Sequence, residues 1–348
     1  MIRFAWLQSR TQALVALIGL AAVAVVLLLT GPDLSHLYAT IIGPCAERGN
    51  CSQTTIASFL QNQKEIRTAL DILVLVIPGI IGVFWGAPLV ARELEAGTFR
   101  LAWTQSVTRT RWLAVKLGVM GLASMAVAGL VSLMTTWWNN PLDRVEANAY
   151  ATFDARDVVP LGYAAFGFVL GVAAGVFIRR TLPAMATVAV VFTAVRVTMS
   201  HWIRPLLFAP ARLALALDPQ STGFGRTSSG PDTLQPGSPN IPNAWIQSIR
   251  IVNDTGKTLS PDVLASTCPQ LGVADRPTGG PTVRTQVPDT VRNALEDCIT
   301  KVGNTYHQVV TYHPADRYWA FQWYELAIYV GAAFALAGIC IWSLRRRS

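Results

Sequence analysis

The sequence predicts an all-α polytopic membrane protein with six transmembrane helices and a small α+β extracytoplasmic insert between helices five and six. Composition is the first observation behind this prediction: 52% of the 348 residues are hydrophobic and only 14% are charged, whereas a soluble domain carries about 25% charged residues. Six long apolar segments are the second. The third is that the polar connections between these segments alternate between strongly basic and nearly neutral.

Each of the six apolar segments is long enough for a membrane span, since a helix needs about 20 mostly apolar residues to cross a bilayer. They lie near residues 13–30, 69–90, 113–136, 158–178, 183–202 and 323–344. The chain is therefore expected to divide into three parts. Residues 1–202 hold helices one to five, residues 203–322 form the insert, and residues 323–348 hold helix six and a basic tail.

The basic residues predict the orientation of the chain. Twelve Lys and Arg residues lie on one side of the predicted membrane, with only Glu93 and Glu95 as acidic neighbours, and the other side is close to neutral. Since short loops rich in Lys and Arg stay in the cytoplasm, we expect both termini in the cytoplasm and the protein in the plasma (inner) membrane. The net charge of +8 is then explained without nucleic acid. The N-terminus also resembles a secretory signal, but its apolar core is long for one.

Four of the five cysteines lie in predicted external segments, where disulfides persist. They are Cys45, Cys51, Cys268 and Cys298. Four cysteines allow three pairings, and we favour Cys45–Cys51 and Cys268–Cys298 because each pair shares one segment. Four free thiols are the alternative. Cys340, inside the last span, is expected to be a packing residue.

The insert contains signs of an ordered α+β fold. Residues 219–243 are rich in Pro, Gly, Ser and Thr and predict a loop. The patterns that predict two strands and one amphipathic helix lie at residues 245–252, 307–312 and 289–302. Ser260 before Pro261 predicts the start of another helix.

No catalytic or metal site is predicted. Residues 255–258 look like the end of a phosphate-binding loop, but that motif needs a Gly where Ile251 stands. None of the four histidines has a ligand or a triad partner at a recognisable spacing. We therefore expect neither an enzyme activity nor a cofactor in this chain.

The most informative stretch is the basic connection between the second and third predicted helices, residues 91–112. It is strongly charged and then amphipathic. Gly97 is suited to end the helix that leaves the second span, Thr98 is suited to cap a new short helix, and Trp103 gives that helix apolar surface. The pattern predicts a short helix at the cytoplasmic membrane surface, with exposed groups that are able to dock to a partner.

At these residues the chain resembles the type-two permeases of ATP-binding-cassette (ABC) exporters, the ABC-2-like family, and in particular its actinobacterial members. That family carries Glu-x-Glu-x-Gly-Thr after its second span, then a Leu, a small-Pro-Val-x-Arg turn and a Lys that opens the third span. The matching residues here are Glu93, Glu95, Gly97, Thr98, Leu101, Val107, Arg109 and Lys116. Ser106 replaces the usual Pro. Residues 312–319, running into Gln322, also resemble actinobacterial members.

The resemblance implies the permease subunit of an exporter whose short helix seats in a groove of a separate cytoplasmic ATPase subunit. The contact residues carried over from the family are Glu93, Glu95, Gly97, Thr98, Arg100 and Trp103. ATP and magnesium would be bound by the ATPase, and a second permease copy, identical or different, would complete the channel. The cargo would be amphiphilic, such as a drug, antibiotic, lipid or peptide. The alternative for the segment itself is a basic amphipathic helix lying on anionic lipid.

Three ionisable residues near the predicted membrane need partners: Asp71, Arg196 and Glu325. A charge at the bilayer centre costs about 2.5–3.5 kcal/mol on insertion scales. We expect Arg196 to pair with Asp71 or Glu325 near an outer gate. The alternative is that Arg196 extends to the outer lipid headgroups.

Two other classes of function compete with the exporter. A membrane-anchored receptor would bind a ligand with the insert, but six spans are more than an anchor needs and no cytoplasmic output domain is present. A membrane enzyme acting on lipid would need clustered Asp, Glu or His at membrane depth, and the sequence shows only scattered ones. The exporter permease is therefore the leading prediction.

Overall fold

The chain forms two compact units in a computed structural model that describes residues 2–48, 51–95, 109–146, 148–219, 222–226, 232–237, 239, 241–269 and 289–346. Met1–Leu207 and Asp316–Ser348 form a helical unit, and Phe208–Ala315 form a smaller unit of strands and helices. The predicted insert, 203–322, extends beyond the smaller unit at both ends. The reason is that the helices on either side continue past their most apolar residues.

The helical unit contains, within the described residues, six helical stretches that are long and apolar enough to cross a membrane. They are Ala13–Glu47, Thr54–Arg92, Leu113–Glu146, Ala149–Ile178, Thr181–Leu206 and Ala315–Ser343. Their number and order agree with the sequence prediction, which confirms a polytopic all-α membrane protein with a small insert.

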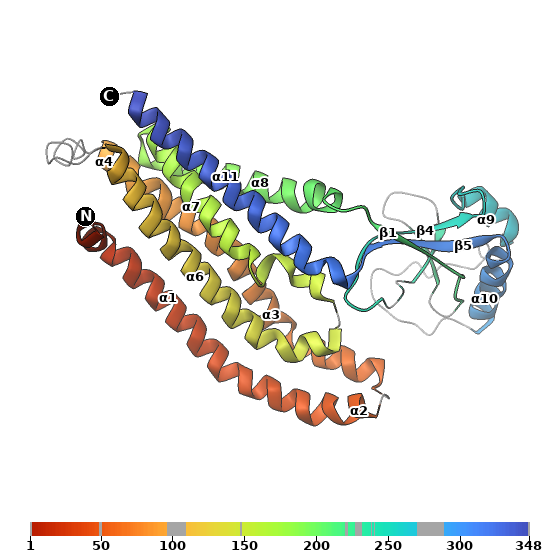
Figure 1. Cartoon of the computed structure of the whole chain (residues 1–348). Helices are drawn as coiled ribbons and strands as arrows, with labels where there is room; N and C mark the ends of the chain where they lie inside the picture. The colour runs from red at the N-terminus through yellow and green to blue at the C-terminus, as the bar shows by residue number, and fades with distance from the viewer. Residues whose placement is uncertain are drawn as a thin grey trace. The chain divides into compact units, whose positions relative to one another are not determined.

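The helices of this unit run up and down along its length (Figure 1). The longer ones are α1 (Ile2–Leu37), α3 (Gln53–Ile80), α4 (Ala87–Glu95), α6 (Arg109–Glu146), α7 (Val159–Ile178), α8 (Thr181–Thr198) and α11 (Tyr318–Arg346). Shorter segments are η1 (Tyr38–Ile42), α2 (Gly43–Glu47), η2 (Ile81–Gly86), η3 (Ala149–Ala155), η4 (Met199–Ile203), η5 (Arg204–Leu206) and η7 (Ala315–Arg317). We call the end that carries the N-terminus, α4 and the C-terminus the terminal end. The opposite end, where η5 and η7 lead into the smaller unit, is the insert end.

The central helix of the unit is α7, which packs against α11, α6, α4 and η2. It is apolar on every face, and a helix of that kind is stable only when it is surrounded. Phe168 and Val172 are fully buried in it. By contrast, α1, α8 and α11 expose large apolar side chains such as Leu29, Leu182 and Phe334, as expected of helices whose outer faces meet lipid.

Glycines let α7 approach η2 and α4 backbone to backbone. A Cβ added to Gly82 would lie 2.5 Å from the carbonyl oxygen of Gly167, and one added to Gly175 would lie 2.8 Å from the carbonyl oxygen of Ala87. Small residues at this spacing are typical of close helix packing in membranes. Here η2 is a π-helical segment that begins three residues after Pro78, and both features are common causes of a bend in a helix.

Helix α3 is longer than the second predicted span. Its first turns are polar, and Ser52 caps them by accepting a hydrogen bond from the Thr55 N–H (3.1 Å). A hydrogen-bonding Ser at the cap position satisfies one of the free N–H groups of a helix start. Residues 53–68 are too polar for a membrane span, but Phe59 is buried there and packs in the same core as Trp138. This extension carries polar side chains beyond the apolar part of the span.

The smaller unit is built on a three-stranded antiparallel sheet with the strand order β1-β5-β4 and on a separate β2-β3 hairpin. The strands are β1 (Ala211–Leu215), β2 (Gly223–Arg226), β3 (Asp232–Gln235), β4 (Trp245–Asn253) and β5 (Tyr306–His313), and the helices are α9 (Pro261–Thr267) and α10 (Asp289–Gly303). The predicted strands near 245–252 and 307–312 and the predicted helix near 289–302 are present. The prediction of a plain loop at 219–243 was wrong, since β2 and β3 pair there; their short strands contain Gly and Asp, which weaken a strand pattern.

Both favoured disulfides are present. Cys45 is bonded to Cys51 and Cys268 to Cys298, with Cα–Cα distances of 4.8 and 5.5 Å. The second joins the end of α9 to α10 within a core that includes Ile299. Cys340 is a buried free thiol that packs in the helical core.

Candidate functional site

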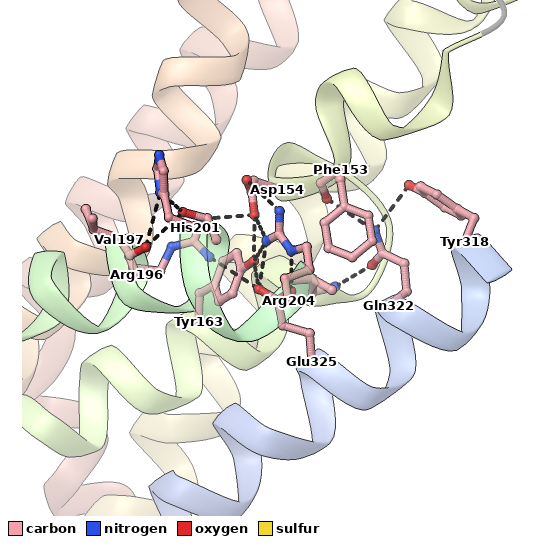
Figure 2. A network of polar contacts seen from close by, with 12 residues as sticks. Phe153, Asp154, Tyr163, Arg196, Val197, His201, Arg204, Tyr318, Gln322 and Glu325 are labelled. Carbon is pink, nitrogen blue, oxygen red and sulfur yellow. Dashed lines mark hydrogen bonds and ion pairs between the residues drawn. The ribbon is translucent and has the colours of Figure 1, made fainter. Parts of the chain in front are cut away.

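Five polar side chains form a cluster at the insert end of the helical unit (Figure 2), and all but Asp154, whose side chain is 33% exposed, are buried. We call it the ionic cluster. Its members come from η3, α7, α8, η5 and α11, and they are Asp154, Tyr163, Arg196, Arg204 and Glu325. Segments that are far apart in the sequence therefore meet at one point.

Glu325 and Arg204 form the tightest pair of the ionic cluster. Arg204 Nε donates to Glu325 Oε2 at 2.8 Å, and Arg204 Nη2 donates to Glu325 Oε1 at 2.9 Å. Two parallel bonds of this kind are both strong and directional. Arg204 also forms an ion pair with Asp154, so one guanidinium holds two carboxylates from α11 and η3.

Arg196 provides the second positive charge of the ionic cluster. Its Nη2 lies 3.3 Å from Asp154 Oδ1 and its Nη1 lies 3.6 Å from Glu325 Oε1. Its guanidinium carbon lies 3.4 Å from the centre of the Tyr163 ring, a position in which the ring face attracts a cation. The Tyr163 hydroxyl is within hydrogen-bonding reach of Glu325 (2.5 Å) and of Asp154 (2.9 Å).

The charges of the ionic cluster balance, because two guanidinium groups face two carboxylates. Glu325 has no exposed surface, and Arg196 and Arg204 are 8% and 6% exposed. Taking a charge out of water costs several kcal/mol, so groups this buried persist only when each is paired. The cluster therefore ties four helical segments together only while all four charges are in place.

A chain of hydrogen bonds that ends at the Asp157 carboxylate extends the ionic cluster along α11. Gln322 Oε1 accepts the first N–H of α7, from Val159, at 3.1 Å. Gln322 Nε2 donates to the Phe153 carbonyl (3.2 Å) and to the Tyr318 hydroxyl (3.1 Å), which donates to Asp157 at 2.6 Å. The first turns of α11 are thus fixed to η3 and to the start of α7.

The structure places the three predicted membrane charges in two different locations. Arg196 and Glu325 lie together in the ionic cluster, with Asp154 as the second carboxylate beside Arg196. Asp71 lies on α3 and lines a different pocket, so it is not a partner of Arg196. Sequence reasoning missed Asp154 and Arg204. The sequence did show that both residues lie within a few residues of the ends of apolar spans, where burying an ion pair costs less free energy than at the centre of the membrane.

At the terminal end, α4 is connected to α8 through Glu95, the last residue of α4. Glu95 Oε2 accepts hydrogen bonds from the Thr181 hydroxyl (2.7 Å) and from the Thr181 backbone N–H (3.2 Å). Arg180, the residue before α8, provides no side-chain cap, so Glu95 caps α8 from a neighbouring helix. The hydroxyl bond, followed by the backbone bond, lowers the pKa of the exposed Glu95 carboxyl from its ordinary value.

The other predicted contact residues are placed only in part. Glu93 lies in α4, two residues before Glu95. Gly97, Thr98, Arg100 and Trp103 lie outside the described residues, so the predicted helix between 96 and 108 remains a prediction. Within the described residues, no group of three or more His, Cys, Asp or Glu side chains is placed to hold a metal ion.

Comparison with known proteins identifies a family. A family model described as "ABC-2 membrane transporter related" matches residues 17–204. The chain has no match among curated proteins and none among solved structures. The matched range runs from residue 17, inside α1, past the end of α8. It includes α4, which ends in Glu95, and Asp154, Arg196 and Arg204 of the ionic cluster. Since it spans more than half of the chain, this protein belongs to the ABC-2 membrane transporter related family, and the six apolar helices among its described residues make it a multi-pass membrane protein.

Proposed function

We propose that the protein is the permease subunit of an ABC exporter that moves an amphiphilic substrate, such as a drug, antibiotic, lipid or peptide, across the plasma membrane. A separate ATPase subunit supplies the energy and binds ATP and magnesium, and the permease itself needs no cofactor. A second permease copy completes the path. The observation that carries this proposal is the family match over residues 17–204.

The position of α4 supports a coupling role for the segment that follows it. Residues 96–108 come directly after α4, and α4 is held on two sides. On one side the Ala87 and Ala91 backbone lies against Gly175 of α7. On the other side Glu95 is hydrogen-bonded to Thr181 of α8. A displacement of residues 96–108 by an ATPase would therefore move α4 and, through these contacts, α7 and α8.

We infer that the ionic cluster holds the opposite ends of α7 and α8 in one arrangement until its ion pairs break. It connects η3, α7, α8, η5 and α11, and its positive and negative charges no longer cancel when one charged group moves away. In the proposed cycle, the terminal end faces the cytoplasm and the ATPase, in agreement with its excess of Lys and Arg. The insert end, with its disulfides, then faces outward.

The proposal is tested by co-expressing the tagged full chain with candidate ATPase subunits from the same genome and purifying it in mild detergent. We expect a stoichiometric ATPase in the complex. Its hydrolysis should fall when Glu93 and Glu95 are both changed to Ala, and it should be unchanged by Glu65→Gln, which alters an exposed carboxylate of α3. Absence of an ATPase from the complex with every candidate would contradict the proposal and favour a receptor whose insert binds a ligand.

A further inference from the structure

A polar pocket lies at the insert end of the helical unit, apart from the ionic cluster. It has a volume of about 380 Å³ and lies between α3, the end of α6 and η3. Its charged and polar lining residues are Gln61, Lys64, Arg67, Thr68, Asp71, Glu146 and Thr152. We call it the α3 pocket.

Two buried oxygen atoms of the α3 pocket have no hydrogen-bond partner among the described residues. One is Oδ1 of Asp71 and the other is Oγ1 of Thr152. Thr152 is only 6% exposed. Buried polar atoms are nearly always hydrogen-bonded, and an exception calls for an explanation such as a bound ligand or water. The Asp71 carboxylate only accepts hydrogen bonds, whereas the Thr152 hydroxyl both accepts and donates, so a donor group is able to satisfy both atoms.

The positive charges of the α3 pocket do not fill this role. Arg67 acts electrostatically on Asp71, but its ion pair is formed with Glu146 and not with the Asp71 carboxylate. Arg156 does not line the pocket, although its charge also acts on Asp71. Its Nη1 forms an ion pair with Asp143, and its buried Nε and Nη2 make no hydrogen bond to either oxygen atom. Lys64 is exposed and forms no ion pair within the described part of the chain. It lies seven residues before Asp71, on the same face of α3, and therefore adds a free positive charge about two turns away.

The position of the α3 pocket along α3 favours a ligand from the membrane surface. The second spanning stretch has 39 residues, Thr54–Arg92, and is about 58 Å long at 1.5 Å per residue. The hydrocarbon core of a bilayer is about 30 Å thick. Because the apolar part of the stretch begins near residue 69, Thr68 and Asp71 lie where the span meets the lipid headgroups, and the residues before them extend outward from that boundary.

We propose that the α3 pocket binds a primary ammonium group, of the kind carried by the ethanolamine headgroup of a phospholipid. An ammonium group has three N–H donors, which match the Asp71 carboxylate and the Thr152 hydroxyl. Lys64 then faces the phosphate of the same headgroup. A trimethylammonium group such as that of choline has no N–H donor and leaves both oxygen atoms unsatisfied. The inference does not depend on the exporter function, since it concerns the purified chain alone.

The test compares two lipids that differ only in this group. The full chain is reconstituted in nanodiscs of phosphatidylglycerol with either phosphatidylethanolamine or phosphatidylcholine, and lipid retained after purification is measured by mass spectrometry. We expect preferential retention of phosphatidylethanolamine. Asp71→Asn should weaken that retention about 10- to 100-fold, because a hydrogen bond between charged groups is lost. Thr152→Val should weaken it less, because it removes a neutral acceptor.

Glu65→Gln is the matched control, because Glu65 is an exposed carboxylate of the same helix that does not line the α3 pocket. It should leave the preference unchanged. Thr152→Val decides the result if Asp71→Asn does not fold. If soluble phosphoethanolamine competes with the lipid and phosphocholine does not, the α3 pocket recognises the lipid headgroup. If the soluble amine binds and neither lipid is preferred, the α3 pocket recognises a free amine. Equal retention of both lipids together with no effect of soluble amine, or a preference that both variants keep, would overturn the proposal.

Discussion

The charge of Glu325 is predicted to be essential for the stability of the helical unit. Glu325→Gln keeps the size of the side chain but leaves Arg196 and Arg204 facing Asp154 alone, with one uncompensated buried positive charge. The lost interactions are the two bonds from Arg204, at 2.8 and 2.9 Å, and the 3.6 Å ion pair with Arg196. Breaking a buried pair by removing one partner costs about 3–5 kcal/mol. For a unit of this size that lowers the melting temperature by about 10 °C.

The assay is thermal unfolding of the purified full chain in detergent, followed by size-exclusion fluorescence. Asp316→Asn is the control, since it neutralises an exposed carboxylate just before α11 and should change the melting temperature little. Arg204→Gln should be as harmful as Glu325→Gln. The double variant removes one charge of each sign and leaves Arg196 with Asp154 at 3.3 Å, so its loss should be smaller than the sum of the single losses by about 0.5–3 kcal/mol. Additive losses, or single variants as stable as Asp316→Asn, would refute this account of the ionic cluster.

Three further predictions follow from individual contacts. The hydrogen bonds from Thr181 lower the pKa of Glu95, so their contribution to folding stability is present above the ordinary carboxyl pKa and is lost as the pH falls through the lowered value. Hydrogen exchange should therefore show the Thr181 N–H protected at neutral pH, and Glu95→Gln should reduce this protection. Gly171→Ala should destabilise the chain by about 1–3 kcal/mol, because a Cβ would lie 2.7 Å from the Ala87 nitrogen, whereas Gly338→Ala, with nothing within 4 Å, should not. Cys268→Ser should make the smaller unit of the full chain sensitive to limited proteolysis, since opening a loop with a sequence separation of 30 costs about 3–4 kcal/mol; equal sensitivity with and without the bond would contradict this.

The six spans were predictable from the sequence because hydropathy alone determines them. A bilayer has no water to satisfy a backbone, so a long apolar segment must become a helix. The polar extension of α3 was not predictable in this way. Residues 53–68 have no apolar stripe strong enough for a span, and their helix is stabilised by the Ser52 cap, by contacts with η3 and by the packing of Phe59 against Leu27 and Trp138.

The ionic cluster was predictable only in part, because sequence spacing does not encode its contacts. Arg204 and Glu325 are 121 residues apart, and the smaller unit lies between them in the sequence. The cost of a membrane charge indicated that Arg196 needed a carboxylate, but it did not distinguish Asp71 from Glu325. By contrast, the contact of η2 and α4 with α7 carried a signal in the sequence: Gly82 and Gly86 repeat at a spacing of four, as do Gly167, Gly171 and Gly175, which is typical of close helix packing.

Helix α8 connects the two candidate functional regions of the helical unit. Its first residue, Thr181, is bonded to Glu95 at the terminal end, and Arg196, near its last turn, belongs to the ionic cluster. With 18 residues it is about 27 Å long at 1.5 Å per residue, which is close to the thickness of the hydrocarbon core. Between these two ends α8 packs on α7, so it cannot bend freely. A change at Glu95 is therefore expected to reach Arg196 as a movement of the whole helix. Because the charges at the other end are buried, that movement has two outcomes: the ion pairs of Arg196 stay formed, or they break.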